Sequence, residues 1–393
     1  MAIGGGDSTR AVHGSRCLED PYGSVVPPLY RSAIYRYPCR GGAAFHGRPL
    51  KYIREDNPSV YCAERLLALL EEGESGLGFN TGMSAFTVLV LGLVGRGDRV
   101  AALAHMYGTA LQLLEELSRR LGFSLDLFYS VDEFVEGVGG GGYRVVFLES
   151  MTNPLLYVPP IDEVAKACRD AEDCLLVVDN TFTTPYLLKP LRLGASLVVH
   201  SATKYLGGHN DVAGGFVVGP GRLVDGVLWE WRRMTGSIMQ PDSAYLVARG
   251  VKTLPLRVER QSRTARVVAE FLLEHPRVAE VYYPGLPGHP SHSVASRLFL
   301  RRLYGGVLSF RIRGAGMSDV ERFLSRLRVI TPAPSLGGVE STIAYPVVSS
   351  HSTISEEERR RLGITPDLVR LSVGLEDPED LLEDLDRALT AAG

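Results

Sequence analysis

The chain has 393 residues, of which 45% are hydrophobic and 22% charged, and its formal net charge at pH 7 is -3. This length corresponds to about two to three domains, and the composition is that of a globular protein, which excludes disordered, collagen-like and coiled-coil chains. The 42 basic residues nearly balance the 45 acidic ones, without runs of like charge. No strong field therefore favours nucleic acid or anionic lipid, and small neutral or zwitterionic ligands are expected.

The cysteines are widely spaced, and none belongs to a Cys/His cluster of the zinc-binding type. We therefore expect reduced thiols and no metal site. The N-terminus lacks the apolar core of a signal peptide, and the longest apolar run, 86–94, is too short to cross a membrane. The sequence thus predicts a cytoplasmic protein. Its five cysteines are Cys17, Cys39, Cys62, Cys168 and Cys174.

Residues 1–56 are rich in Gly, Pro, Tyr and Arg with little periodicity, which is typical of an extended arm. From 57 to 248, amphipathic or apolar helical segments alternate with short apolar runs that contain few polar residues. This pattern indicates an α/β domain with a mostly parallel sheet covered on both faces. The expected helices are 60–72, 83–94 and 110–121, and the expected strands are 99–103, 124–129, 143–149, 174–179, 197–200 and 215–218.

The remaining part, 249–393, begins with a long amphipathic stretch at 256–275 and then mixes strands with helices, which predicts a smaller α+β domain. The glycine run 139–142 is expected to be a surface loop. Strands are expected at 280–283, 307–312 and 368–373, and helices at 318–327 and 378–391.

One of only five lysines, Lys204, follows an apolar strand together with Ser201 and Thr203. A partly desolvated amine has a lowered pKa, as Schiff-base chemistry with a carbonyl requires. The two hydroxyls could donate hydrogen bonds to a phosphate. The alternative is a lysine that merely extends from the strand end into solvent.

Asp179 ends the neighbouring apolar strand, where an aspartate is often only a helix cap. Beside a Schiff-base lysine, however, a carboxylate suits the protonation of a pyridine nitrogen. Gly82 and Met83 open an apolar helix, so that their N–H groups could bind an anion, although an ordinary helix start is the favoured interpretation when this segment is taken alone. Tyr107 follows the strand 99–103 and could stack on a flat cofactor or simply pack.

Two further polar residues lie where ligands are expected. Asn153 follows Glu149 after a strand and could contact a ligand or only form an Asn-Pro turn. Arg370 lies within an apolar strand, where an unpaired guanidinium is costly. Its partner could be the carboxylate of an amino-acid substrate or an internal acid. No GxxxxGK[ST] or GxGxxG motif follows a strand, which disfavours nucleotide binding.

Taken together, these segments resemble the Cys/Met-metabolism family of pyridoxal phosphate (PLP)-dependent enzymes, the group of cystathionine γ-synthase, cystathionine γ-lyase and methionine γ-lyase. The resemblance covers nearly the whole chain. It rests on residues 10–13, 26–30, 52–58 (YIREDNP), 81–83, 107–108, 149–154 (ESMTNP), 178–182 (VDNTF), 198–211, 244–254, 335–341 and 370–377.

The resemblance implies that Lys204 carries the cofactor covalently, Asp179 pairs with the pyridinium and Tyr107 stacks on the ring. It implies that the phosphate and the cofactor edge are held by Gly82, Met83, Thr181, Ser201 and Thr203. Tyr52 and Arg54 of the arm are expected to reach the phosphate of the neighbouring subunit. Asn153, Ser335 and Arg370 match positions that bind the substrate carboxylate or the cofactor edge, which favours the substrate as the partner of Arg370.

The implied fold is the aspartate aminotransferase-like type I fold, in a homotetramer built from two dimers with shared sites. The implied activity is γ-elimination or γ-replacement on sulfur amino acids or O-acylhomoserine. Methionine γ-lyase and O-acylhomoserine sulfhydrylase are the alternatives, and a PLP-binding sensor without turnover is the non-enzymatic one. The thiol partner stays open, because the chain departs from the family pattern at Thr109, Ala110, Pro334, Ala344 and Tyr345.

Overall fold

The computed structural model describes residues 5–36, 44–171, 173–349, 351–352 and 354–391. Its larger sheet has seven strands in the order β3-β9-β8-β7-β6-β4-β5. Only β9 runs antiparallel to its neighbours, so the predicted mostly parallel sheet is confirmed. The strands are β3 (Ser75–Phe79), β4 (Arg99–Leu103), β5 (Ser124–Phe128), β6 (Val145–Glu149), β7 (Leu175–Asp179), β8 (Leu197–Ser201) and β9 (Gly215–Gly219).

The larger sheet is covered on both faces because its central strands consist mostly of buried apolar residues. In β6, Val145 and Phe147 pack into one hydrophobic core, whereas Val146 and Leu148 pack into the other. Successive side chains of a strand point to opposite faces, so an uninterrupted apolar run needs helices on both sides. One face carries α2 (Pro58–Glu71), α5 (Val131–Gly140), α6 (Ile161–Asp170) and α9 (Pro241–Val251), and the other α3 (Gly82–Leu93), α4 (Gly108–Leu121), η2 (Arg222–Leu228) and α8 (Trp229–Thr235).

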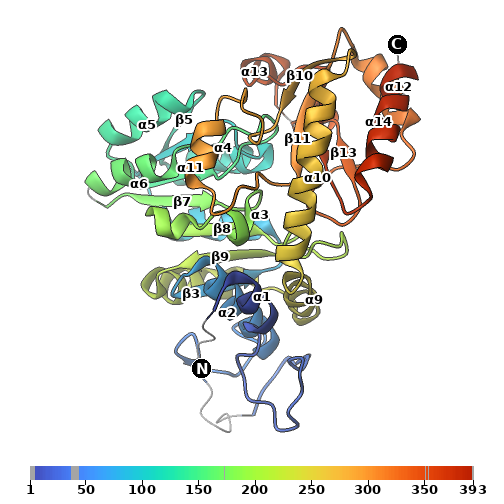
Figure 1. Cartoon of the computed structure of the whole chain (residues 1–393). Coiled ribbons are helices and arrows are strands. Elements are labelled where there is room, and N and C mark those ends of the chain that lie inside the picture. Colours follow the sequence, from blue (N-terminus) through green and yellow to red (C-terminus); the bar gives the residue numbers. More distant parts are fainter. Residues whose placement is uncertain (1–4, 37–43, 172, 350, 353, 392–393) are drawn as a thin grey trace.

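A second sheet, of five strands in the order β10-β11-β14-β13-β12, lies in the C-terminal part. The long helix α10 (Leu254–Glu274) runs from the larger sheet to this smaller one (Figure 1). The other elements of the C-terminal part are β10 (Val278–Tyr282), α11 (His292–Leu298), β11 (Val307–Ile312), α12 (Met317–Arg326), β12 (Thr331–Pro332), β13 (Thr342–Ala344), η3 (Pro346–Val348), α13 (Glu356–Arg361), β14 (Leu368–Ser372) and α14 (Pro378–Ala391). The predicted α+β character of this part is therefore found.

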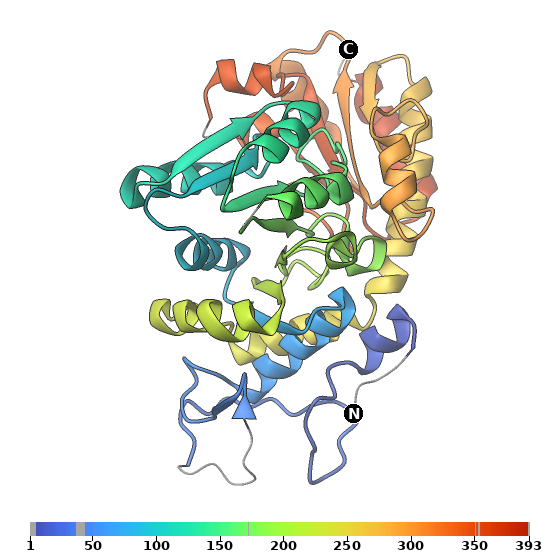
Figure 2. The ribbon, with the colours of Figure 1, turned by 90° about the vertical axis from the view of Figure 1, so that its left-hand side faces the viewer.

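The N-terminal segment extends away from the smaller sheet, at the opposite end of the molecule (Figures 1 and 2). It is not wholly irregular, because it contains the helix α1 (Asp7–His13) and a short hairpin of β1 (Ala44–Phe45) and β2 (Arg48–Pro49). The hairpin turns at His46 and Gly47, whose φ angles of 50° and 75° are those of a tight hairpin turn. Short elements α7 (Thr184–Leu187) and η1 (Pro190–Leu193) join β7 to β8.

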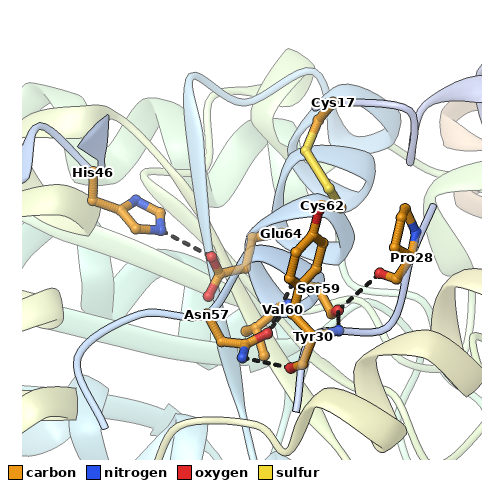
Figure 3. The surroundings of a disulfide bond; sticks show 9 residues. All are labelled: Cys17, Pro28, Tyr30, His46, Asn57, Ser59, Val60, Cys62 and Glu64. Atoms are coloured by element: carbon orange, nitrogen blue, oxygen red, sulfur yellow. Dashed lines mark hydrogen bonds and ion pairs between the residues drawn. A yellow bond between two sulfur atoms is a disulfide. The ribbon is translucent and has the colours of Figure 1, made fainter. Parts of the chain in front are cut away.

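The N-terminal segment is fixed to the start of α2 by a disulfide and by hydrogen bonds (Figure 3). Cys17 is bonded to Cys62. The N–H of Tyr30 donates to Ser59 Oγ at 2.9 Å, and Asn57 Nδ2 donates to the Tyr30 carbonyl at 2.8 Å. The side chain of Asn57 also caps α2. Residues that follow α1 in the chain are thus held where the main domain begins.

The expectation of reduced thiols is wrong for four of the five cysteines. Besides the bond between Cys17 and Cys62, Cys168 is joined to Cys174. Wide spacing in the sequence was a poor guide, because folding brings Cα atoms that are 45 positions apart to 5.4 Å. Cys39 lies outside the described residues. Among those residues, no helix combines the length and apolar character needed to cross a membrane.

Candidate active site

The candidate residues gather at the carboxyl ends of neighbouring strands. β6, β7 and β8 are parallel and adjacent, and they end in Glu149, Asp179 and Ser201. Glu149 and Asp179 are directly opposite each other in the register of the two strands. Ligands of open α/β sheets bind at this edge, so the fold itself brings these polar residues to one place.

Lys204 lies in the turn that follows β8. Its Nζ donates a hydrogen bond to Ser335 Oγ at 2.7 Å, which links the larger domain to the C-terminal part. Burial, and then the nearby positive charge of Arg370, lower the pKa of Lys204 to about 8. A considerable fraction of the amine is therefore neutral near physiological pH, and neutral amines attack carbonyl carbons.

The Asp179 carboxylate is fixed by a local chain of hydrogen bonds. Its Oδ1 accepts the N–H of Thr181 at 2.9 Å, and Thr181 Oγ1 accepts the N–H of Ser201 at 2.8 Å. Burial raises the pKa of Asp179. A buried carboxylate is stable as an anion only beside a cation or several donors, so this position fits a protonated ring nitrogen.

The start of α3 has the donor groups for an anion. Thr81 caps the helix through a reciprocal pair of bonds with Ser84. The first N–H groups of a helix, here those of Gly82 and Met83, have no acceptor within it, and they attract negative charge. A Cβ added at Gly82 would lie 2.9 Å from Ser201 Cβ, so only glycine lets the helix start approach the end of β8 this closely. The N–H groups that begin α3 and the hydroxyl that ends β8 therefore lie close together.

Thr203 belongs to the same group of donors. Its Oγ1 accepts the N–H of Gly214 at 3.2 Å, which leaves the hydroxyl hydrogen available to another acceptor. The side chain lies in the turn between Ser201 and Lys204.

Tyr107 is the residue that caps α4, and its side chain is 41% exposed at the same sheet edge. Its N–H donates to Glu149 Oε1 at 2.8 Å. No role for Glu149 was predicted from the sequence, and the structure shows that it fixes the backbone of Tyr107.

Arg370 lies in β14, where it is only 4% exposed. Its Nη1 donates to Asn153 Oδ1 at 2.6 Å and its Nη2 to the Ser335 carbonyl at 2.8 Å, whereas Nε has no acceptor among the described residues. Among the described residues no carboxylate forms an ion pair with Arg370, so the internal acid considered above is not found there. Burial lowers the pKa of Arg370 to about 10, as expected for a guanidinium without an anionic partner.

Ser335 connects the two basic residues. Its hydroxyl accepts from Lys204 and its carbonyl accepts from Arg370. The backbone of Ser335 is left-handed, with φ of 89°, a conformation that non-glycine residues rarely adopt and that is frequent at functional sites. One continuous hydrogen-bonded chain between the larger and the smaller sheet therefore contains Lys204, Ser335, Arg370 and Asn153.

Tyr52 and Arg54 do not join this chain. Both are exposed, and the Arg54 guanidinium lies 5.5 Å from the centre of the Tyr52 ring. The described hydrogen bond of Arg54 is to the Arg233 carbonyl, at 3.1 Å. The expected contact of these side chains with a neighbouring subunit is not tested by a single chain and stays a prediction.

Two residues that support Lys204 were not identified from the sequence. The fully buried Tyr205 follows Lys204, and its hydroxyl accepts the N–H of Gly306 at 3.1 Å. Arg257 of α10 donates to the Tyr205 carbonyl at 2.9 Å. A buried arginine in the amphipathic stretch 256–275 was the available signal, but its partner could not be read from the pattern.

A buried group of His46, Asp56 and Glu64 brings possible metal-ligand atoms within 4.8 Å of one another. The Arg232 guanidinium, however, donates to Asp56 Oδ1 at 2.9 Å and also to Glu64 Oε1. A cationic side chain thus already neutralises the two carboxylates. We interpret this group as an ionic network and not as a metal site.

Residues 8–390 match the family described as Cys/Met metabolism PLP-dependent enzyme. The L-methionine gamma-lyase of Pseudomonas putida is 40% identical over 393 residues, which cover 98% of each chain. The cystathionine gamma-lyase of Bacillus subtilis (strain 168) is 40% identical over 382 residues, covering 97% of this chain and 98% of the relative. The cystathionine gamma synthase of Xanthomonas oryzae pv. oryzae, solved in complex with cystathionine, matches with a TM-score of 0.93 at 35% identity and covers 99% of both chains.

These matches extend over nearly the whole chain and connect its fold with a known class of enzymes. They confirm the predicted fold class, a type I PLP-dependent fold with a mostly parallel sheet and a smaller α+β part. The relatives are lyases and a synthase named for sulfur amino acids. The chain therefore belongs to the Cys/Met-metabolism family of PLP-dependent enzymes.

Proposed function

We propose that this enzyme uses PLP to cleave or exchange the γ-substituent of a sulfur amino acid or of O-acylhomoserine, as cystathionine γ-lyases and γ-synthases do. One observation carries the proposal. The Lys204 amine, with its pKa lowered to about 8, is hydrogen-bonded to Ser335 in the chain that ends at the buried Arg370 guanidinium. A nucleophilic amine and a carboxylate-binding group are thus held close together.

The described residues fit PLP as the cofactor. Lys204 would bind it covalently, Asp179 would face its ring nitrogen and Tyr107 would cover the ring. The N–H groups of Gly82 and Met83, together with hydroxyls of β8 and its following turn, suit the phosphate. Thr181 holds the Asp179 carboxylate in place. The close approach at Gly82 supports this fit, because a Cβ there would meet Ser201.

Bound PLP would supply an electron sink for negative charge at the substrate Cα. The chain's own residues do the rest. Arg370, whose Nε has no acceptor among the described residues, binds the substrate α-carboxylate, and Asn153 keeps the guanidinium in position. The Lys204 amine removes the Cα proton. A second deprotonation, at Cβ, then allows the γ-substituent to leave.

The choice between elimination and replacement depends on whether water or a thiol completes the reaction. The relatives named above include both lyases and a synthase. They therefore support the general chemistry but do not favour any single substrate. Methionine γ-lyase and O-acylhomoserine sulfhydrylase activities remain the alternatives. Thr109 and Ala110, beside the candidate ring-stacking Tyr107, depart from the family pattern and would affect this choice.

We also propose that the arm, residues 1–56, completes the site of a neighbouring subunit in a dimer, and that two dimers form a tetramer. The exposed positions of Tyr52 and Arg54 support this arrangement, because exposed side chains are accessible to another chain. The other proposed units are the PLP-binding domain, 57–248, and the C-terminal domain, 249–393. A cytoplasmic location stays a prediction, and the two disulfides remove reduced thiols as an argument for it.

Two measurements test the proposed function. Borohydride reduction followed by digestion and mass spectrometry should find the pyridoxyl group on Lys204, and the variant Lys204→Ala should lack it. An adduct on another lysine would contradict the assignment. Cystathionine, methionine, and O-acylhomoserine with cysteine should then be assayed separately, with identification of the 2-oxo acid. PLP binding without turnover of any of them would favour the sensor alternative.

A further inference from the structure

Glu149 is an acid at the candidate site that has no role in the proposed reaction. It ends β6, directly opposite Asp179 in the strand register, and is only 5% exposed. Its Oε1 accepts the N–H of Tyr107 at 2.8 Å, whereas the buried Oε2 has no partner among the described residues. An unpartnered buried carboxyl oxygen is costly, and native proteins retain such an atom where it has a use.

The surroundings of Glu149 disfavour a negative charge. Among the described residues no Lys, Arg or His nitrogen lies within ion-pair distance of it. Burial, and then the neighbouring Asp179 carboxylate, raise the pKa of Glu149 well above its usual value, and the Tyr107 N–H and the charge of Arg370 oppose this only in part. Two neighbouring carboxyl groups in a desolvated site do not both ionise readily, so one of them keeps its proton.

The two acids differ in what they can stabilise. Asp179 accepts the N–H of Thr181 and is expected to face the ring nitrogen, a cation when protonated. Glu149 has only the backbone N–H of Tyr107. The negative charge therefore belongs on Asp179 and the proton on Glu149.

We propose that Glu149 is a positioning residue that acts as a neutral carboxylic acid: it holds the Tyr107 backbone, and so its ring, over the cofactor and leaves the negative charge to Asp179. This inference rests on the proposed function, because the ring of Tyr107 has this use only when PLP is bound. Glu149 acts through Tyr107 and Asp179 and takes no part in proton transfer to the substrate.

The test compares Glu149→Gln with Glu149→Ala. Glutamine keeps an acceptor for the Tyr107 N–H and replaces the acid hydroxyl by an NH₂ donor, so it imitates the neutral acid. Alanine removes both. Glu115→Ala is the control, because Glu115 is an exposed acid on α4, the helix that begins directly after Tyr107. The readouts are the dissociation constant of PLP from PLP-free protein, the pH midpoint of the absorbance of bound cofactor, and kcat and KM.

Glu149→Gln should bind PLP within about twofold of the wild type and leave the pH midpoint within about 0.3 units. Glu149→Ala should weaken PLP binding roughly tenfold, the loss expected when a single buried hydrogen bond is removed, and should lower kcat more than it raises KM. If Glu149 acts through Tyr107, its truncation should cost little in a Tyr107→Ala background.

A change of the midpoint by about one unit or more in Glu149→Gln would show an ionised Glu149 and overturn the proposal. Wild-type behaviour of Glu149→Ala would show that no positioning role exists. If Glu149→Ala does not fold, Glu149→Asp, which withdraws the carboxyl by one methylene group, replaces it with the same expectations. Failure of the wild type to bind PLP would instead refute the proposed function.

Discussion

Two cationic side chains share the centre of the candidate site. The charge of Arg370 is the second cause, after burial, of the lowered pKa of Lys204. Arg370 in turn is buried without an ion pair among the described residues, and its pKa is lowered to about 10. A substrate carboxylate would relieve the repulsion between these groups, so substrate binding and the protonation of Lys204 are coupled.

The variant Arg370→Gln should show this coupling. Without the neighbouring positive charge the pKa of Lys204 should rise from about 8, so that the pH dependence of PLP attachment moves to higher pH. The KM for the amino acid should increase on the order of 100-fold, because a charge-assisted contact is lost. Stopped-flow absorbance measures the first effect and steady-state kinetics the second. Arg360→Gln, on the exposed face of α13, is the control, and an unchanged pH dependence would contradict the coupling.

At the residue scale, the sequence predicts which side chains end strands but not which of them touch. Asp179 could be placed because it closes an uninterrupted apolar run, and Ser201 because it ends a strand that begins with the apolar residues 197–199. The bond between Arg370 and Asn153 joins positions 217 residues apart, and no local periodicity reports which loop folds back onto β14. The hydrogen bond from Tyr107 to Glu149 escaped prediction for the same reason.

Among the elements, the β1–β2 hairpin is held by a buried ionic network. His46 Nδ1 donates to Asp225 Oδ1 at 2.7 Å, and His46 Nε2 donates to Glu64 Oε2 at 2.8 Å. Burial opposes the charge, but the carboxylates of Glu64 and Asp225 raise the pKa of His46 to about 9. The histidine is therefore protonated at neutral pH and ties the hairpin to α2 and η2.

The pH dependence of stability should reveal this network. Because the folded-state pKa of His46 lies above its ordinary value of about 6.5, its contribution is complete below pH 6.5 and is lost as the pH rises through 9. The free energy of unfolding should fall by roughly 2–3 kcal/mol across this window in the wild type. In His46→Gln, urea denaturation should show a flatter profile. The exposed His209→Gln should keep the wild-type slope, and an equal slope in all three proteins would count against the network.

The two disulfides should differ in what they contribute. The bond between Cys17 and Cys62 spans 45 positions, whereas that between Cys168 and Cys174 spans 6. A longer closed loop restricts the unfolded chain more, so replacing the first pair by alanine should cost about 4 kcal/mol and the second about 2 kcal/mol. Denaturant unfolding under non-reducing conditions measures both. The reverse order would show that loop length does not govern their effect.

The sequence predicted elements best where the hydrophobic period was clear. The helix 378–391 and the strand 99–103 are found with the expected bounds, since both have clean apolar patterns. β3 (Ser75–Phe79) was not expected, because its glycines at Gly76 and Gly78 hide a strand that is recognisable only by its pairing with β9. The prediction of a surface loop at 139–142 is wrong for Gly139 and Gly140, because α5 continues through Gly140.

At the scale of the whole molecule, the arm lies at the end opposite the smaller sheet (Figures 1 and 2), whereas Lys204 follows β8 of the larger sheet. If the arm completes the site of a neighbouring subunit, each site combines Lys204 of one subunit with Arg54 of the other. The variants Arg54→Ala and Lys204→Ala then remove residues that different subunits contribute to one site. Each hybrid dimer of the two variants should then contain one site with both wild-type residues.

Subunit mixing tests this arrangement directly. Neither variant alone should retain PLP as the wild type does, but mixed and reassembled subunits should recover wild-type affinity at one site of each hybrid dimer. Fluorescence titration with PLP measures this recovery, and mixing either variant with itself is the control. Absence of recovery, although mass spectrometry detects hybrids, would refute the cross-subunit role of Arg54.

The bond between Cys17 and Cys62 also determines how the chain responds to a protease. It closes a loop that contains the exposed Tyr22 and the hairpin, so a cut within this loop releases no fragment. The nicked protein would run as a single band in a gel without reductant and as two bands after reduction. Stability to digestion should therefore be judged on reduced samples, because otherwise a severed arm would be mistaken for an intact one.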